Sequence, residues 1–185
     1  MTLLTANRLA DELTGLFRPF CERWEIAGSI RREKSIGIKD IEIVAIPKLE
    51  EIQAGLFGEP AGAKNLFLDA LDQAVAGGVL SKRIGENSGQ QCWGPKHQRA
   101  VYKGEAVDIF QVIPPAQWGA ILAIRTGPAG YSRSLVTPKP YGYMPFGMKL
   151  KDGGLYRGTD LIPTPEEEDF FAALAIAWVP PGDRE

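Results

Sequence analysis

Two acidic residues, Asp40 and Glu42, lie two positions apart at the start of an apolar run that ends at Pro47. Residues 39–46 alternate acidic and apolar types and then stay apolar, which predicts a strand. Side chains two positions apart in a strand project from the same face. Like charges this close repel each other, and a divalent cation that prefers carboxylate oxygen relieves the repulsion. The pair therefore predicts a metal site, with Mg²⁺ as the natural ion.

A third acid, Asp108, lies among apolar neighbours in a second strand-like segment, residues 105–112. Two interpretations are open. Asp108 can face solvent from a half-exposed strand, because charged residues are mostly exposed. Alternatively it is buried and shares the cation of Asp40 and Glu42, because a buried carboxylate without a partner is costly. Its occurrence together with the first pair favours the metal site.

The segment before the acidic pair combines a glycine, a hydroxyl and two guanidinium groups. Residues 24–27 predict a short strand, and Gly28 after it lets the backbone approach a ligand closely. Ser29 can cap a following helix or donate its hydroxyl to a phosphate. Arg31 and Arg32 would place positive charge at the start of that helix, where the helix dipole disfavours it. An anionic ligand explains the two arginines better than helix stability does.

The remaining hydrophobic pattern indicates the elements that position these groups. Apolar residues at helical spacing predict helices over residues 3–21 and 64–75. Residues 81–112 predict hairpin strands that end with the strand of Asp108. Together these segments predict an α+β fold with a mixed sheet and helices on one face. Glycine and proline become frequent from Thr126 onward, which indicates a smaller C-terminal subdomain.

Composition agrees with a compact enzyme of one domain or two small lobes. The chain has 185 residues, of which 44% are hydrophobic and 24% charged, enough to bury a core. A formal net charge of -2 gives no global reason to bind nucleic acid. Residues 121–158, however, hold six cations and one acid, a net charge of +5. This region either contacts a phosphate backbone or is a solvated surface.

Other reactive side chains carry weaker signals. Cys21 and Cys92 lack metal-ligand spacing and are expected to be reduced thiols of a cytoplasmic protein. His97 has no partner motif, which favours a surface histidine. The first residues lack a cationic region before an apolar one, and no apolar run approaches membrane-spanning length. We expect a cytoplasmic monomer without a membrane partner.

Three motifs together carry a family resemblance. The Gly-Ser-x-Arg-Arg of residues 28–32, the Asp-x-Glu of residues 40–42 and the Val-Asp-Ile of residues 107–109 resemble the DNA polymerase beta (family X) nucleotidyltransferases, especially the short phage-type members. The likeness continues with a helix that leads to a Thr-Gly turn, a hairpin, a terminal helix and a tail. These segments are residues 117–127, 153–156, 165–174 and 178–181.

The resemblance covers residues 24–185 and implies a nucleotidyltransferase palm-like catalytic domain over residues 1–124. A small C-terminal thumb-like subdomain would occupy residues 125–185. Asp40 and Glu42 would bridge two Mg²⁺ ions, with Mn²⁺ as a substitute. Asp108 would bind the ion that activates a primer hydroxyl.

For the nucleotide, the resemblance implies that Ser29 and Arg32 hold the triphosphate. The full nucleotide-binding set would be Gly28, Ser29, Arg31, Arg32, Arg125, Thr126, Gly127 and Ser132. The implied partners are a nucleoside triphosphate and DNA, as a primer-template or a gapped duplex.

Several positions depart from the family's pattern. Glu42 stands where most members carry aspartate, Arg125 where an aromatic residue screens the sugar, and Ser132 where an asparagine contacts the base. Some members build the turn at Gly127 with a cis peptide, and proline lowers the cost of the cis form to about 0.5–1 kcal/mol. We therefore predict a cis bond between Gly127 and Pro128. The alternative is a trans proline that starts a helix.

These expectations combine in a metal-dependent nucleotidyltransferase, a minimal family X-like DNA polymerase that adds nucleotides to a 3′-hydroxyl and releases pyrophosphate. Two other functions stay open. A non-polymerase nucleotidyltransferase would act on a small molecule, RNA or protein, and the C-terminal resemblance argues against it. A noncatalytic nucleic-acid-binding remnant would tolerate loss of any acid, whereas all three candidate ligands are present.

Overall fold

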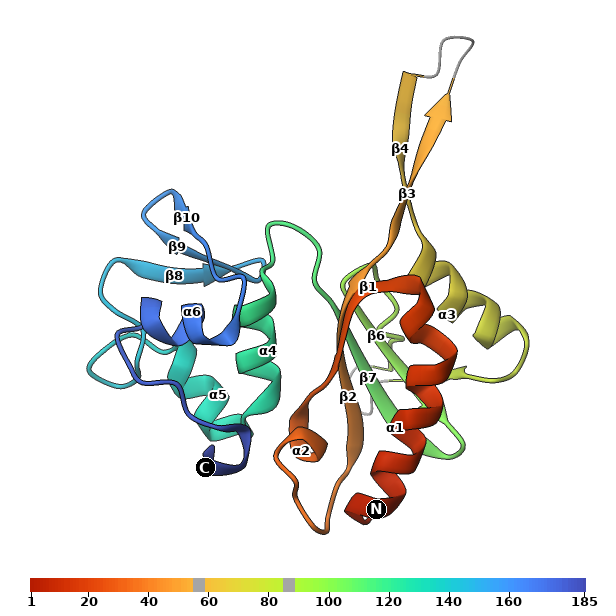
Figure 1. Cartoon of the computed structure of the whole chain (residues 1–185), viewed down its shortest axis with the longest axis horizontal. Coiled ribbons are helices and arrows are strands. Elements are labelled where there is room, and N and C mark those ends of the chain that lie inside the picture. The colour runs from red at the N-terminus through yellow and green to blue at the C-terminus, as the bar shows by residue number, and fades with distance from the viewer. Residues whose placement is uncertain (55–58, 85–88) are drawn as a thin grey trace.

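The computed structural model describes residues 1–54, 59–84 and 89–185 and forms two lobes that lie side by side (Figure 1). The N-terminal lobe is built on a five-stranded sheet in the order β1-β2-β7-β6-β5. Its central pair, β2 and β7, is parallel, and the other pairs are antiparallel. The expected α+β class with a mixed sheet is therefore confirmed. The strands are β1 Cys21–Ile26, β2 Asp40–Pro47, β5 Ser81–Lys82, β6 His97–Tyr102 and β7 Glu105–Gln111.

Two helices, α1 (Leu3–Phe17) and α3 (Leu66–Ala76), cover one face of this sheet. Strand alternation turns Ile41 and Ile43 of β2 toward these helices, with Val107 and Ile109 of β7 beside them in the main core. Both predicted helices are confirmed. The first is shorter than expected, because the short 3-10 turn η1 (Arg18–Phe20) follows it.

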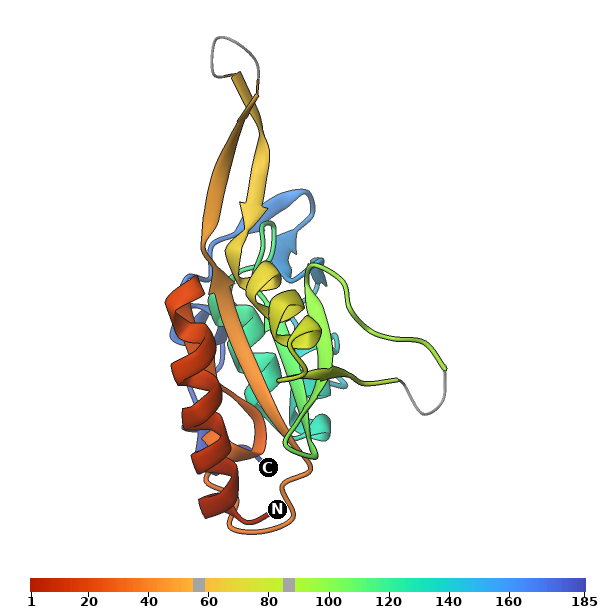
Figure 2. The same ribbon diagram turned by 90° about the vertical axis from the view of Figure 1, so that its right-hand side faces the viewer.

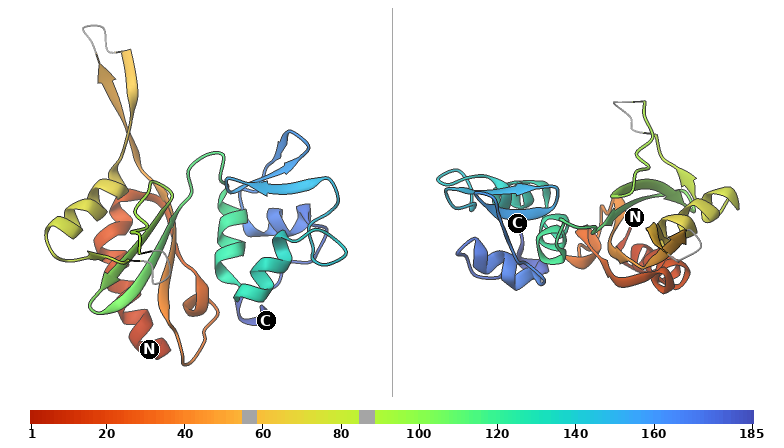
Figure 3. Two further views of the ribbon diagram at one scale, coloured as in Figure 1. Left: turned by 180° about the vertical axis from the view of Figure 1, so that it is seen from behind. Right: turned by 90° about the horizontal axis from the view of Figure 1, so that it is seen from above.

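The same alternation directs Asp40 and Glu42 to the opposite face of the sheet. On that face a smaller core joins Val44 and Phe110 to Leu122 of α4 (Trp118–Thr126), the first helix of the C-terminal lobe. The linker of residues 112–117 crosses between the lobes at one end, as the views from behind and above show (Figure 3). The expected boundary at residues 124 and 125 falls inside α4, which packs against α6 as well as against β2.

The C-terminal lobe packs its helices and a three-stranded sheet around Leu135, Met144, Phe170 and Phe171. The sheet has the order β10-β9-β8. Within the described ranges, no helix is long and apolar enough to span a membrane. The elements after α4 are α5 Ala129–Val136, β8 Met148–Lys151, β9 Gly154–Arg157, β10 Asp160–Ile162, α6 Glu167–Ala173 and the 3-10 turn η2 Pro181–Asp183.

An antiparallel two-stranded arm projects away from both lobes (Figure 2). It consists of β3 (Leu49–Ala54) and β4 (Glu59–Asn65), between β2 and α3. The sequence pattern did not predict it, because residues 49–65 lack a sustained period-two alternation of apolar residues.

Candidate active site

The three predicted carboxylates lie on the two central strands of the sheet. Asp40 and Glu42 belong to β2, and the parallel register with β7 places Glu42 directly beside Asp108. Asp108 is buried and does not face solvent, which excludes the half-exposed strand interpretation. The structure therefore brings the predicted acids onto neighbouring strands.

Burial and mutual repulsion leave Asp40 and Glu42 poorly stabilised as anions. Burial, reinforced by Asp40, raises the pKa of Glu42 to about 7. Burial, reinforced by Asp108, also raises the pKa of Asp40. Carboxylate oxygens are the ligands that Mg²⁺ prefers, and a divalent ion would relieve both effects. The donor types and their crowding therefore fit such an ion at Asp40 and Glu42.

The carboxylate of Asp108 is held by arginines. Arg83 Nη2 donates to its two oxygens at 2.9 and 3.1 Å, and Arg99 Nε lies 3.4 Å from Oδ1. Among residues 1–54, 59–84 and 89–185, no three acidic, histidine or cysteine side chains are gathered as a metal-holding group. Asp108 would have to exchange Arg83 for a cation to complete the predicted site.

Neither Arg83 nor Arg99 was predicted. The sequence did contain a signal for Arg99, namely the Lys103-Gly104 turn between β6 and β7. Lys103 and Gly104 both have positive φ, the conformation of a two-residue hairpin turn. Such a turn fixes the register of β6 on β7 and sets Arg99 opposite Asp108. No comparable local pattern indicates Arg83, which follows the two-residue strand β5.

Gly28 is required by close approach to Glu42. Its φ is +61°, and a Cβ added there would lie 1.9 Å from Glu42 Oε2. The helix α2 (Gly28–Arg31) has a single turn, with Ala27 as its N-cap and no side-chain cap. The expected capping by Ser29 is thus wrong. Arg31 and Arg32 end this helix instead of starting it, so the helix dipole gives no argument for an anionic ligand.

A cavity of about 420 Å³ opens between the lobes beside the acids of β2. Seven predicted site residues line it: Ser29, Arg32, Asp40, Glu42, Arg125, Gly127 and Ser132. Lys39, which was not predicted, lines it as well. Gly28, Arg31, Thr126 and Asp108 do not line it, so the predicted set is only partly gathered in one space.

Arg32 joins the two lobes at the wall of this cavity. It donates to the carbonyl oxygen of Thr126 and, at 3.3 Å, to Ser29 Oγ. Burial lowers its pKa. Ser132 directs its hydroxyl into its own lobe, where Oγ donates to the carbonyl of Ile124 at 2.6 Å. Arg32 and Ser29 are therefore hydrogen-bonded to each other at the wall of the cavity.

A cationic and aromatic cluster lies beside Asp108. The Arg125 guanidinium stacks 3.8 Å from the ring centre of Phe110, and His97 stacks on the same ring at 4.5 Å. Burial, followed by repulsion from Arg125, lowers the pKa of His97 to about 4. His97 is thus a half-buried, neutral cluster member, not the free surface histidine that was expected.

Arg31 of the N-terminal lobe binds two side chains of the C-terminal lobe. Its guanidinium donates to both carboxylate oxygens of Glu167 at 2.8 and 2.9 Å and to Thr126 Oγ1 at 2.8 Å. Arg184 Nη1 donates to the same carboxylate at 2.8 Å. Burial acts to raise the pKa of Glu167, but these two arginines lower it overall.

The acidic stretch that contains Glu167 begins helix α6. The N-cap is Glu166, which forms a capping box with Asp169. Glu167 is only 4% exposed, so it is a buried connector between lobes and not a solvated charge.

The predicted cis peptide at Gly127 is wrong. In the described ranges, the cis bonds are Pro114-Pro115 and Lys139-Pro140. Gly127 is extended, and Pro128 is the N-cap of α5. The fixed φ of proline suits this position in the trans form, which was the stated alternative.

The elements that follow α5 have a known counterpart. Residues 144–185 match the family model of the DNA polymerase beta thumb. The matched segment contains β8 to β10, α6 and η2, so a thumb-like domain fits these residues of the expected subdomain, and the match supports a relationship to DNA polymerase beta. The match to a polymerase thumb suggests an interaction with DNA. No curated protein matches the chain.

Proposed function

We propose that the chain is a metal-dependent nucleotidyltransferase, with a palm-like N-terminal lobe and a thumb, that acts as a minimal DNA polymerase. One observation carries the proposal: the acids of β2 and the Ser29–Arg32 pair line a single cavity closed by the other lobe. Acids beside cations suit a metal-bound triphosphate, because the ions and the guanidinium divide its negative charge.

Each group has a defined role in this proposal. Asp40, Glu42 and Asp108 would hold Mg²⁺, with Mn²⁺ as a substitute. Bound ions supply neutralisation of the phosphates and a lower pKa for the attacking 3′-hydroxyl. Ser29 and Arg32 bind the triphosphate and orient it, and Arg32 links this contact to the thumb-side turn through Thr126.

The thumb favours DNA over the other acceptors. An enzyme that transfers nucleotides to a small molecule, RNA or protein would have no evident need for a polymerase thumb. A noncatalytic remnant would not require Gly28 to leave space for Glu42.

A primer-extension assay tests the proposal. Primed DNA, gapped DNA, primed RNA and unprimed controls are each supplied with single dNTPs and rNTPs plus Mg²⁺ or Mn²⁺. We expect extension of the DNA primer with release of pyrophosphate. Transfer to RNA or a small acceptor alone would identify the non-polymerase alternative, and no transfer to any acceptor would support the remnant.

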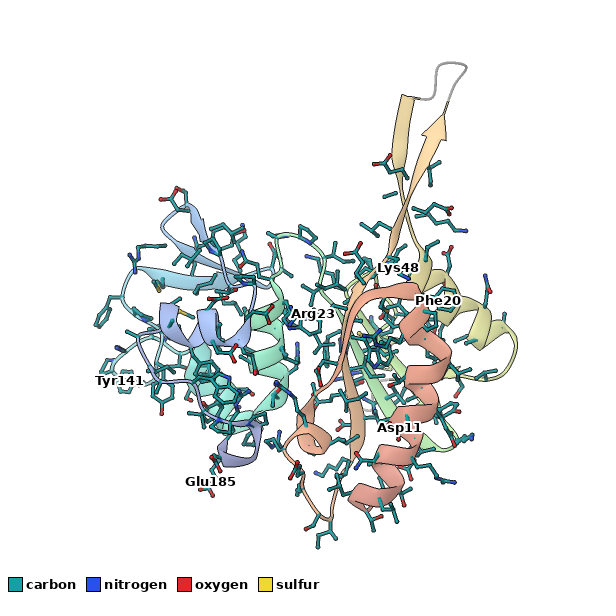
Figure 4. The ribbon with its side chains drawn as sticks, in the orientation of Figure 1. Asp11, Phe20, Arg23, Lys48, Tyr141 and Glu185 are labelled. Carbon is teal, nitrogen blue, oxygen red and sulfur yellow. The ribbon has the colours of Figure 1, made fainter. Side chains whose placement is uncertain are left out.

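An active-site variant makes the assay specific to the acids. Asp108→Asn keeps the shape of the side chain but cannot hold a cation, so we expect loss of transfer with the fold intact. Asp11→Asn changes an exposed acid on α1 (Figure 4), the helix that covers the opposite face of the sheet from Asp40 and Glu42. It is the matched control and should keep full activity. Normal turnover by a folded Asp108→Asn protein would contradict the metal-site assignment.

A further inference from the structure

The loop between α5 and β8 exposes three aromatic side chains within six residues. Tyr141 is 89% exposed, Phe146 is 78% exposed, and Tyr143 is also exposed. We call residues 137–147 the aromatic loop. Clustered exposed rings are unusual on a surface that has no partner.

The backbone of the aromatic loop is anchored. Tyr143 N donates to the Ser134 carbonyl at 2.8 Å, and Met144 N donates to the Thr137 carbonyl at 3.0 Å. The Met144 side chain is buried in the core of the lobe. Gly142 approaches α5 so closely that a Cβ would lie 2.5 Å from the Ser134 carbonyl. The rings are therefore held outward by a fixed backbone, which lowers the entropy cost of binding a partner.

The segment that carries the rings is cationic. Residues 126–151 contain no acid. Their four cations are exposed and, within the part of the chain that the structure describes, form no ion pair: Arg133, Lys139, Lys149 and Lys151. Arg157 is paired with Met148 in the adjoining β8–β9 ladder and adds a fifth exposed cation. Unpaired cations beside exposed rings are complementary to a phosphate backbone with free bases.

We propose that the aromatic loop is a stacking platform for an unpaired DNA strand that extends from the active-site cavity. Rings stack on any base, because every base has a π-face, and the cations contact the phosphates. The family match begins at Met144, so Tyr141 and Tyr143 precede the segment that the thumb match explains. The platform rests on the proposed function, because it requires a primed DNA substrate in the cavity.

Helix α5 supplies the path from the cavity to the platform. Ala129 and Ser132 near its start line the cavity, and Ser134 near its end binds the aromatic loop. Eight residues at 1.5 Å each make α5 about 12 Å long. At about 3.4 Å per stacked nucleotide, three to four nucleotides span this distance. Tyr141 lies at the outer edge of the thumb lobe, away from the N-terminal lobe (Figure 4).

The test measures binding of primed DNA hairpins by fluorescence anisotropy, with 5′ overhangs of about zero to eight nucleotides, a range set by the length of α5. We expect affinity to rise until the overhang reaches three to four nucleotides and then to level off. The Tyr141→Ala/Phe146→Ala double variant should bind long overhangs at least fivefold more weakly. Its binding of the hairpin without an overhang should be unchanged.

Two control variants isolate stacking. Tyr141→Phe/Phe146→Tyr keeps the rings and should bind like the wild type. Leu161→Ala removes an exposed apolar residue from β10 of the same lobe and should have no effect. Thermal melting of every variant verifies folding, which exposed substitutions should leave intact.

Several outcomes would overturn the platform. They are equal weakening on hairpins with and without overhangs, no dependence on overhang length, tighter binding of an RNA overhang than of DNA, or self-association of the wild type that the double variant abolishes. If the protein binds primed DNA without any overhang dependence, the platform alone fails. If it binds no primed DNA at all, the proposed polymerase function fails as well.

Discussion

At the scale of single residues, the candidate active site depends on a glycine that leaves space for a carboxylate. Gly28 has a positive φ, and Glu42 Oε2 occupies the position that a β-carbon would take. The carboxylate itself is held where burial and its acidic neighbours raise its pKa. The site thus keeps negative charge in an unfavourable position, an arrangement typical of functional residues.

The first prediction concerns Gly28→Ala. The substitution imposes a left-handed conformation on a residue with a β-carbon, at a cost of about 1–2 kcal/mol, and displaces the Glu42 carboxylate. We expect lower stability in urea denaturation and a larger fractional loss of Mg²⁺-dependent activity. Gly130→Ala in α5 is the matched control, because nothing lies within 4 Å of its added β-carbon. An active Gly28→Ala protein would show that the position of Glu42 is unimportant.

The second prediction concerns Glu42→Gln in metal-free protein. The folded pKa of Glu42 is raised above its unfolded value, so the stability it contributes below pH 4.5 is lost as pH rises through about 7. Glutamine cannot ionise, so the variant does not lose stability as pH rises. We expect it to be more stable than the wild type at pH 8 by about 1–3 kcal/mol. Melting curves of both proteins with and without Mg²⁺ measure this difference in stability. Mg²⁺ should stabilise the wild type more than the variant, and equal stabilisation would contradict a metal role for Glu42.

At the scale of elements, the start of α6 is bound by two arginines of the other lobe. Arg23 of β1 forms a bidentate pair with Glu166, with Nη1 donating to Oε1 at 2.7 Å, and this pair is half-exposed. Arg31 of α2 pairs with the buried Glu167. Exposed pairs contribute little, whereas loss of one partner of a buried pair is costly. The inner pair therefore dominates the attachment of α6 to α2.

The third prediction follows for Glu167→Gln. The neutral amide leaves the buried guanidinium of Arg184 without a counter-charge, and we expect a loss of about 3–5 kcal/mol at pH 7. Because the folded pKa of Glu167 is lowered, its stabilisation exists above pH 4.5 and is lost as pH falls through the folded pKa. Urea denaturation at pH 7 and at pH 3 measures the difference, which should shrink at pH 3. Glu168→Gln, exposed on the same helix, should be neutral at both values.

At the scale of the whole molecule, the cavity exists only because two lobes face each other across it. Ser29, Arg32 and Glu42 come from one lobe, and Arg125 and Ser132 come from the other. Ligand binding there must therefore involve both lobes. Arg32, one of the arginines that connect the two lobes, also carries the proposed phosphate contact.

The fourth prediction concerns Arg32→Ala. A charge-assisted contact contributes about 1.5–3 kcal/mol, so Mg²⁺-bound triphosphates should bind at least tenfold more weakly. A nucleoside that lacks phosphates should lose little affinity. Titration calorimetry with both ligands decides it, with the exposed cation Lys151→Ala as control. Equal losses for the nucleoside and the triphosphate would place Arg32 outside the phosphate site.

Sequence reasoning succeeded where a signal was local and periodic. The alternation after Lys39 placed Asp40 and Glu42 on one face of β2, and the helical spacing before Cys21 located α1. It failed where partners are distant in sequence, because no local pattern indicates that Arg83 meets Asp108 or that Arg31 meets Glu167. It also failed for the short helix α2, whose length reversed the expected position of its arginines.

The pairing of Arg31 with Glu167 has a kinetic consequence. The two residues are separated by 136 positions, and contacts of such long sequence separation close slowly, because the chain entropy is lost before the contact forms. The pair should therefore be absent from the folding transition state and form after each lobe has gained its own core. Interactions that form late retard unfolding more than they accelerate folding. Glu167 would then govern how long the assembled molecule persists, while the rate at which it first assembles depends on the two cores.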